Sequence, residues 1–157
     1  MCEVDIHIKF DDVSNEKIES FIKEIDERVV VNGDSIVFVE DTFYEDKSLF
    51  ILGEVRWSLR PEEAIKLLSH VAYKLCVDVN KLYAEIKYLE RGFSIGGMYV
   101  LKDGVLKQGD MSEEDWKTLS EFGIDNPDMS DKDWDCYWTK LFEYIESVDL
   151  VDIHSFK

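Results

Sequence analysis

The stretch that decides the fold of this chain runs from Ala84 to Gly109 and reads AEIKYLERGFSIGGMYVLKDGVLKQG. Apolar and polar residues alternate from Ala84 towards Leu89, and this period of two predicts a strand with one buried face. Asp103-Gly104 predicts a tight hairpin, because a type I′ turn needs positive φ at both central positions. The stretch therefore predicts a strand, a corner, a second strand and a short returning strand, against which the earlier parts of the chain pack.

Three glycines, Gly92, Gly96 and Gly97, lie close together between the first two of these strands. Glycine allows positive φ and lets two backbones approach closely, so we expect a bulge or corner over residues 92–97. A glycine cluster can also cradle a phosphate, but no helix start with Lys or Ser/Thr follows this one. A small-ligand or enzymatic role at this corner stays open as an alternative function.

The residues before Ala84 supply the other elements of the expected core. In chain order we expect strand 4–10, helix 14–25, strand 36–43, strand 49–57, helix 61–78 and strand 84–89. Ser14 is the expected N-cap of the first helix, Asn32-Gly33 turns the chain, and Pro61 takes the first position of the second helix. This order is that of the ferredoxin-like split βαβ, with two helices on one face of an antiparallel sheet. We therefore expect an α+β fold with a ferredoxin-like core domain over residues 1–110.

The composition changes at Met111. Residues 1–110 hold 22 acids and 14 bases, and residues 111–157 hold 13 acids and 4 bases, so their net charges are −8 and −9. Two similar segments, Met111-Ser-Glu-Glu-Asp-Trp116 and Met129-Ser-Asp-Lys-Asp-Trp134, each begin with a Ser suited to N-capping and an acid three residues later. We expect residues 111–157 to form an acidic, Trp-rich helical extension packed on the core.

The tryptophans of this extension have two interpretations. They dock its helices onto the core, or they anchor a partner protein, since Trp is enriched in binding hot spots. In the second case the neighbouring acids form the rim of the interface. The candidate partner-binding residues are then Glu113, Glu114, Asp115, Trp116, Asp131, Asp133, Trp134, Asp135 and Trp138.

Length and composition set the broad class. The chain has 157 residues, of which 45% are hydrophobic and 13% aromatic, which is enough for a packed core and the expected size of one domain with an extension. No apolar run approaches the roughly 18 residues that span a bilayer, and no basic, apolar leader begins the sequence. Cys2, Cys76 and Cys136 are widely spaced and suit neither a disulfide framework nor a metal site. We expect a cytoplasmic protein with inert thiols.

No motif for catalysis or metal binding is present. Asp5 and His7 share one face of the first strand, but no further ligands follow at a fixed spacing. His70 lies beside the apolar stripe of the second helix, and His154 lies in the tail. No Cys or Ser has the sequence context of a nucleophile. We therefore expect no catalytic residue, no metal and no cofactor.

The central part of the chain, about residues 49–109, resembles the YubB-type ferredoxin-like domain of plasmid and phage proteins. The similar residues are Trp57-Ser-Leu-Arg-Pro61, Tyr88-Leu-Glu90-Arg-Gly92-Phe93, Gly97, Tyr99 and Asp103-Gly104. The resemblance implies the ferredoxin-like fold and a mobile-element origin. It supplies no activity and no catalytic residue, and the acidic Trp-rich tail departs from the family pattern.

The net charge of −17 bears on the partner. It disfavours direct binding to nucleic acid or to an anionic membrane, because both are polyanions, and it favours basic proteins. We expect a non-enzymatic inhibitor, of the anti-defence or anti-CRISPR type, whose carboxylates occupy the groove in which a basic effector or nuclease holds phosphates. An immunity protein against a toxin nuclease would bind its partner through the same charge attraction and is one alternative. The other alternative is an acidic surface that is solvated and has no binding role.

Overall fold

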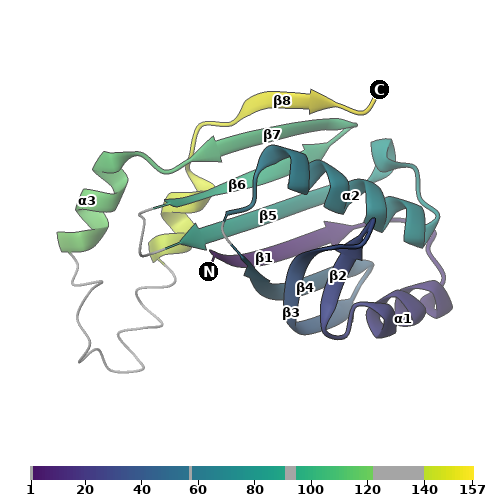
Figure 1. Cartoon of the computed structure of the whole chain (residues 1–157). Helices are drawn as coiled ribbons and strands as arrows, with labels where there is room; N and C mark the ends of the chain where they lie inside the picture. The colour runs from purple at the N-terminus through teal and green to yellow at the C-terminus, as the bar shows by residue number, and fades with distance from the viewer. Residues whose placement is uncertain (1, 57, 91–94, 122–139) are drawn as a thin grey trace.

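The computed structural model describes residues 2–56, 58–90, 95–121 and 140–157 (Figure 1). The elements in chain order are β1 (Cys2–Lys9), α1 (Asn15–Glu24), β2 (Arg28–Val31), β3 (Asp34–Glu45), β4 (Ser48–Val55), α2 (Pro61–Leu75), the 3₁₀ helix η1 (Val79–Lys81), β5 (Tyr83–Glu90), β6 (Ile95–Lys102), β7 (Val105–Asp110), α3 (Glu113–Glu121) and β8 (Val151–Ser155). Residues 140–146 are also helical and are called the C-terminal helix segment below. The strands form one antiparallel sheet in the order β2-β3-β4-β1-β5-β6-β7-β8, so the predicted α+β class is confirmed.

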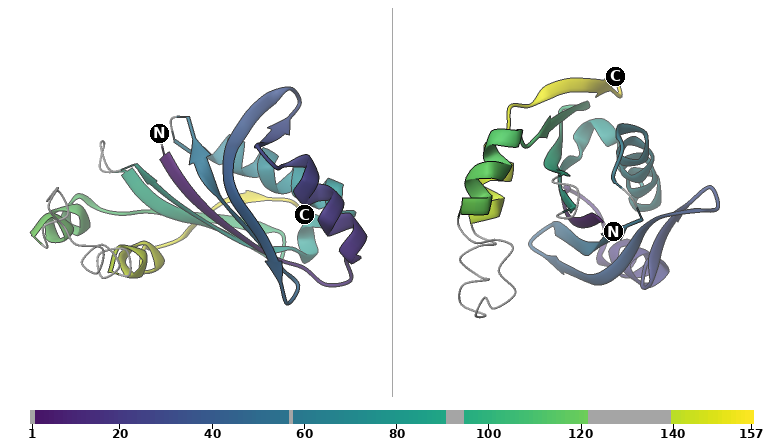
Figure 2. Two further views of the ribbon diagram at one scale, coloured as in Figure 1. Left: turned by 90° about the horizontal axis from the view of Figure 1, so that it is seen from below. Right: turned by 60° about the vertical axis from the view of Figure 1, so that its left-hand side comes forward.

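Helices α1 and α2 cover the same face of the sheet, which we call the inner face (Figure 1). The even-numbered side chains of β1 and β5 point to this face, and Ile6 and Ile86 are fully buried there with Leu68 of α2. The two helices touch through the ion pair of Lys74 with Glu24, at 2.8 Å. Figure 2 shows the sheet curling around α2, so that the main core lies in the hollow of the curl.

Local signals set most boundaries of these elements. The Ser14 hydroxyl accepts a hydrogen bond from the Lys17 amide and begins α1, as predicted. Pro61 begins α2, and the helix ends at Leu75, before the predicted residue 78, because Cys76 adopts a left-handed conformation with φ of 55°. Asp103 and Gly104 have φ of 51° and 76°, which confirms the predicted tight turn.

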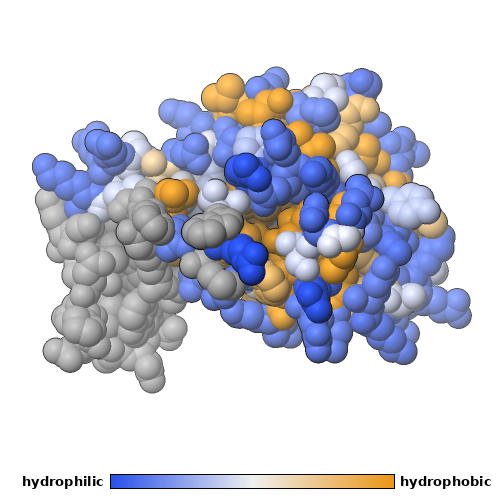
Figure 3. Space-filling view, in the orientation of Figure 1, coloured by the Kyte–Doolittle hydropathy of each residue, from blue (hydrophilic) through white to orange (hydrophobic). Residues whose placement is uncertain are grey.

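Two short edge strands were not expected from the sequence. β2 pairs with the start of β3 across the Asn32-Gly33 turn. β8 pairs with β7 and brings the tail, which was expected to be helical, back into the sheet. Val151 of β8 is 64% exposed, and apolar residues are visible along this edge at the top of Figure 3. Both strands are short and carry a bulge at their pairing, which limits edge-to-edge association.

The prediction of a corner at the glycines is wrong for Gly96 and Gly97. Both lie inside β6, opposite Leu89 and Tyr88 of β5. A Cβ on Gly97 would collide with the Gly109 carbonyl oxygen and would lie 2.6 Å from the Tyr88 hydroxyl. Close approach between neighbouring strands, and not a change of direction, therefore requires glycine here. Gly92 lies outside the described residues.

A second core forms on the outer face, opposite α1 and α2. Its buried residues are Leu89, Met98, Met111, Trp116, Leu141 and Ile145. They come from β5, β6, the link between β7 and α3, α3 itself and the C-terminal helix segment, which lies across the sheet from α2 (Figure 2). Two separate parts of the acidic extension thus meet over the outer face of β5 and β6.

A chain of buried and partly buried hydrogen bonds joins Leu59, Tyr88 and Tyr99, which carry the family resemblance. The Tyr99 hydroxyl donates to the Leu59 carbonyl oxygen at 2.6 Å. The Gln108 side-chain amide donates to the hydroxyls of Tyr99 and Tyr88, and Tyr88 donates to the Asp110 carboxylate. Burial raises the pKa of both tyrosines, so they are neutral donors at physiological pH. The network fixes the loop before α2 against β6 and β7.

This network predicts the effect of removing one hydroxyl. We expect Tyr99→Phe to lower the free energy of unfolding by about 1–3 kcal/mol, because the fully buried ring leaves the Leu59 carbonyl without its donor. Tyr73→Phe is the matched control, since Tyr73 is 78% exposed and should show no change. Urea denaturation measures both variants, and equal midpoints for the two would contradict a structural role for the network.

Candidate functional site

The outer face of the sheet has a covered part and an open part. The C-terminal helix segment packs on β5 and β6, whereas the second core contains no described residue on the outer side of β3, β4 and β1. We call the latter surface the open face. Its side chains, identified from strand register, are Phe38, Asp41, Phe43, Glu45, Ser48, Phe50, Leu52, Glu54, Glu3, Asp5, His7 and Lys9. Five of these twelve residues carry a carboxylate, three are phenylalanines, and Lys9 is the cation among them.

A hollow of about 280 Å³ lies where the open face meets the C-terminal helix segment. Apolar side chains of Leu52, Leu89 and Phe142 line it. Three carboxylates also line it, those of Glu3, Asp5 and Glu40. Lys87 is the cation in its lining, and its Nζ donates to Glu146 at 2.6 Å. The hollow is therefore apolar in part and acidic in charge.

Two electrostatic features of the open face lower the stability of the folded protein. Glu3 and Glu54 are directly opposite each other in the β1–β4 pairing, and like charges in this position are destabilising. Burial raises the pKa of the Asp5 carboxyl, and the nearby Lys87 only partly opposes that rise. Binding a cationic group here would relieve both effects. The open face is therefore suited to a cationic ligand.

His7 lies on β1, at one border of the open face. Its ring stacks on Phe50 with centroids 4.2 Å apart. Burial lowers its pKa, and Lys9 lowers it further, so the imidazole is neutral at physiological pH. Within the described residues, no group of three or more His, Cys, Asp and Glu side chains is arranged to hold a metal ion. His7 therefore contributes a flat ring to this surface and not a charge.

The predicted partner-binding residues fall into four groups. Glu113 and Glu114 are exposed in the first turn of α3. Asp115 accepts a hydrogen bond from the Ser112 amide while its own amide donates to the Ser112 hydroxyl, which confirms the predicted capping box. Trp116 is buried in the second core, as expected of a docking residue rather than an exposed anchor. Asp131, Asp133, Trp134, Asp135 and Trp138 lie outside the described residues.

Sequence reasoning missed the acidic side of the open face. It noted that Asp5 and His7 share a face, but it did not link them to Glu40, Glu54 or Phe43. The alternation of polar residues along each strand was the available signal. The pairing of β1 with β4 and of β4 with β3 was needed to show which polar residues become neighbours.

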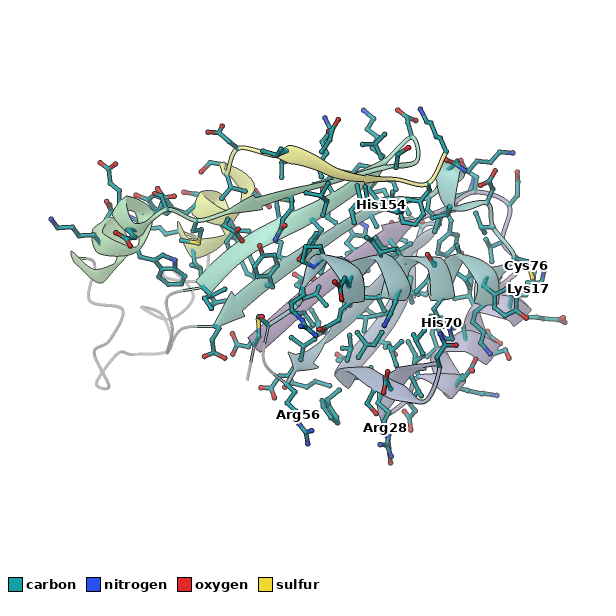
Figure 4. The ribbon with its side chains drawn as sticks, turned by 45° about the horizontal axis from the view of Figure 1, so that its top comes forward. Lys17, Arg28, Arg56, His70, Cys76 and His154 are labelled. Atoms are coloured by element: carbon teal, nitrogen blue, oxygen red, sulfur yellow. The ribbon has the colours of Figure 1, made fainter. Side chains whose placement is uncertain are left out.

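The remaining reactive side chains lie elsewhere (Figure 4). Burial raises the pKa of the Cys2 thiol to about 11, so this thiol is inert at neutral pH. Cys76 is exposed at the end of α2, and Cys136 lies outside the described residues. His70 tilts against Phe21 between α1 and α2. Cys2, Cys76 and His70 are not among the residues that line the hollow.

A second, larger hollow of about 460 Å³ lies beside the start of α2. Arg56, Arg60 and Lys66 line it together with Asp34 and Glu63. Arg60 is bound to Glu63 at 2.9 Å, which neutralises one of the three cations. Figure 4 shows Arg56 projecting away from the body of the protein. Its mixed charge does not select a ligand class.

Comparisons of the chain with protein-family models, with curated proteins and with solved structures found no match. In the described part of the chain, no helix is both long enough and apolar enough to cross a membrane.

The opposed glutamates give a test of the electrostatic description. We expect Glu54→Gln to raise the free energy of unfolding at pH 7 and low salt by about 0.2–1 kcal/mol, because it removes a like-charge pair across β1 and β4. Glu27→Gln, in an exposed loop, is the matched control for loss of one negative charge. A lower stability of Glu54→Gln than of the control would contradict the description.

Asp5 gives a second test, through pH. Its folded pKa is raised, so its contribution to stability is present below the unfolded pKa and is lost as pH rises through the folded pKa. Asp5→Asn cannot lose this contribution. We therefore expect the stability of Asp5→Asn relative to the wild type to increase from acid to neutral pH. Urea denaturation at several pH values measures this difference, and a difference that stays constant or falls would show that Asp5 is not penalised by burial.

Proposed function

We propose that this protein is a non-enzymatic, cytoplasmic, acidic interaction protein that binds and inhibits a basic nucleic-acid-handling protein. Such a protein acts as a nucleic-acid mimic of the anti-defence or anti-CRISPR type. The observation that carries this proposal is the hollow at the open face, where Glu3, Asp5 and Glu40 meet an apolar lining. This moves the proposed contact from the tail, where the sequence placed it, to the sheet.

The hollow matches the chemistry of a lysine or arginine side chain. Such side chains bury an alkyl stem while the charged head stays among polar groups. Leu52 and Phe142 would contact the stem, and the carboxylates of Asp5 and Glu40 would receive the head. A basic partner has such side chains in the groove that holds phosphates. The net charge of −17 supplies long-range attraction to that groove.

The proposal includes a finer description of the fold. We propose that β1, β3, β4 and β5 with α1 and α2 form a ferredoxin-like unit of the YubB type, with β2 and β6 to β8 as additions. The strand order β3-β4-β1-β5 and the contact between α1 and α2 on one face support it. The bond from Tyr99 to Leu59, which joins two segments of the resemblance, also supports it. A mobile-element origin follows from the same resemblance.

The alternative functions differ in their support. An immunity protein against a toxin nuclease would use the open face in the same way, so the partner alone separates the two. A small-ligand or enzymatic role at residues 92–97 has less support. A Cβ on Gly96 would lie 3.1 Å from both Met111 and Trp116, so this glycine is already in close contact with the second core. Gly97 is packed against Tyr88.

Binding to a panel of basic nucleases and nucleic-acid-binding effectors tests the proposal. We expect one of them to bind, DNA or RNA to compete, and association to slow as salt rises from about 0.15 M to about 1 M, where the Debye length falls from roughly 8 Å to roughly 3 Å. The triple variant Asp5→Asn/Glu40→Gln/Glu54→Gln should reduce the on-rate by about tenfold or more, because steering raises on-rates by about 10- to 1,000-fold.

A charge-matched variant locates the contact. Glu113→Gln/Glu114→Gln/Glu27→Gln also removes three negative charges, but from exposed positions outside the open face. We expect this variant to keep most of the on-rate. Equal losses in the two triple variants would assign the effect to net charge, and an unchanged on-rate in both would make the acidic surface a solvated one. Thermal melts of both variants correct for any change in folding.

A further inference from the structure

Three aromatic rings form a continuous stack across the open face. His7 of β1 stacks on Phe50 of β4 with centroids 4.2 Å apart and planes at 15°. Phe50 stacks on Phe43 of β3 with centroids 4.6 Å apart and planes at 13°. Neighbouring strands are about 4.8 Å apart, so directly opposed rings on adjacent strands are spaced for stacking. The stack follows from the register that pairs His7 with Phe50 and Phe50 with Phe43.

The stack ends at Phe43, and its last ring meets solvent. β2 is the next strand in the sheet, but it pairs only with the part of β3 between Asp34 and Phe38. No described strand therefore lies beside Phe43, which is 45% exposed. The middle ring, Phe50, is stacked on both faces, whereas Phe43 has one flat face with no described aromatic partner.

Carboxylates flank this exposed ring on the same face. Asp41 and Glu45 lie two residues on either side of Phe43, and both are exposed. Two residues of strand span about 6.6 Å, so each carboxylate is within reach of a group that covers the ring. Neither carboxylate forms an ion pair with another described residue. The end of the stack therefore combines an exposed aromatic face with two negatively charged hydrogen-bond acceptors, which attract a basic partner.

We propose that Phe43, Asp41 and Glu45 form a binding site for an arginine side chain of the basic partner. This inference rests on the proposed function and names the side chain that the open face selects. A guanidinium group is planar and weakly hydrated, it stacks on aromatic faces, and it donates several hydrogen bonds to carboxylates in a fixed geometry. It would extend the stack by one further flat layer.

Lysine and nucleobases fit this site less well. A lysine ammonium is compact and strongly hydrated, and it has no flat face to stack on a ring. A nucleobase can stack on Phe43, but it carries phosphates that Asp41 and Glu45 would repel. The site therefore favours arginine over both. Charge complementarity and the planar end of the stack lead to the same occupant.

Arginine and lysine homopeptides of equal length test the inference on the full chain. We expect the wild type to bind the arginine peptide more tightly. We expect Phe43→Leu, which keeps an apolar side chain but removes the ring, to reduce the arginine-to-lysine affinity ratio by about two- to fivefold, the range of a cation–π contact at an exposed site. Phe43→Trp, which restores a ring, should restore the ratio. Tyr73→Leu removes an exposed aromatic from α2 and should leave the ratio unchanged.

The ratio within each variant is insensitive to a general loss of stability, so a weakened fold does not obscure the result. Equal affinity of the wild type for the two peptides, or an unchanged affinity ratio in Phe43→Leu, overturns the arginine site. The proposed acidic interaction function is retained in that case if both peptides bind in a salt-dependent way. Failure of both peptides and of every basic protein to bind overturns both. Binding of a single-stranded oligonucleotide that is lost in Phe43→Leu assigns the ring to a nucleobase and overturns the inference.

Discussion

The antiparallel pairing of β1 with β4 on one side and β5 on the other is the constraint on which the rest of the structure depends. β1 is the strand between them, and the register is unbroken from Glu3 to Lys9 on both sides. Because side chains alternate along a strand, a slip of one residue would exchange the two faces. The register that buries Ile6 and Ile8 under α1 and α2 therefore also places Asp5 and His7 on the open face.

Hydrophobic burial fixes that register, and the register in turn determines which polar side chains of β1 lie on the open face. Apolar burial on the inner face contributes enough free energy to offset the electrostatic cost on the open face, where Glu3 lies opposite Glu54 and Asp5 is partly buried. A surface selected for stability alone would alternate charges across these strands. The opposed glutamates and the partly buried Asp5 therefore follow from the register of β1 and are not a source of stability.

The second core forms one border of the open face. Leu141 and Ile145 of the C-terminal helix segment are buried against Leu89 and Met98, and this packing covers the outer side of β5 and β6. The edge of the covered region becomes one wall of the hollow, with Phe142 and Ile145 in its lining. β8 then returns to pair with β7. The acidic extension therefore shapes the candidate site by packing.

The sequence by itself determined the features that depend on neighbours in the chain. Ser14 and Ser112 cap their helices and Asp103-Gly104 turns, because capping boxes and type I′ turns need only residues within about four positions. The alternation of apolar and polar residues in β1 and β5 was likewise visible in the sequence, and it predicted which of their side chains are buried on the inner face. Whether the tryptophans beyond Trp116 anchor a partner stays a prediction, since they lie outside the described residues.

Only the tertiary structure decided which strands are neighbours, and with that the candidate site. Phe43, Phe50 and His7 come from three strands, and nothing in the chain near any one of them specifies the others. The same holds for Gly97, whose need for a small residue comes from Gly109 and Tyr88 on the two adjacent strands. Strand pairing is selected by the burial of the whole inner face, and such a sum over distant residues cannot be read from a local pattern.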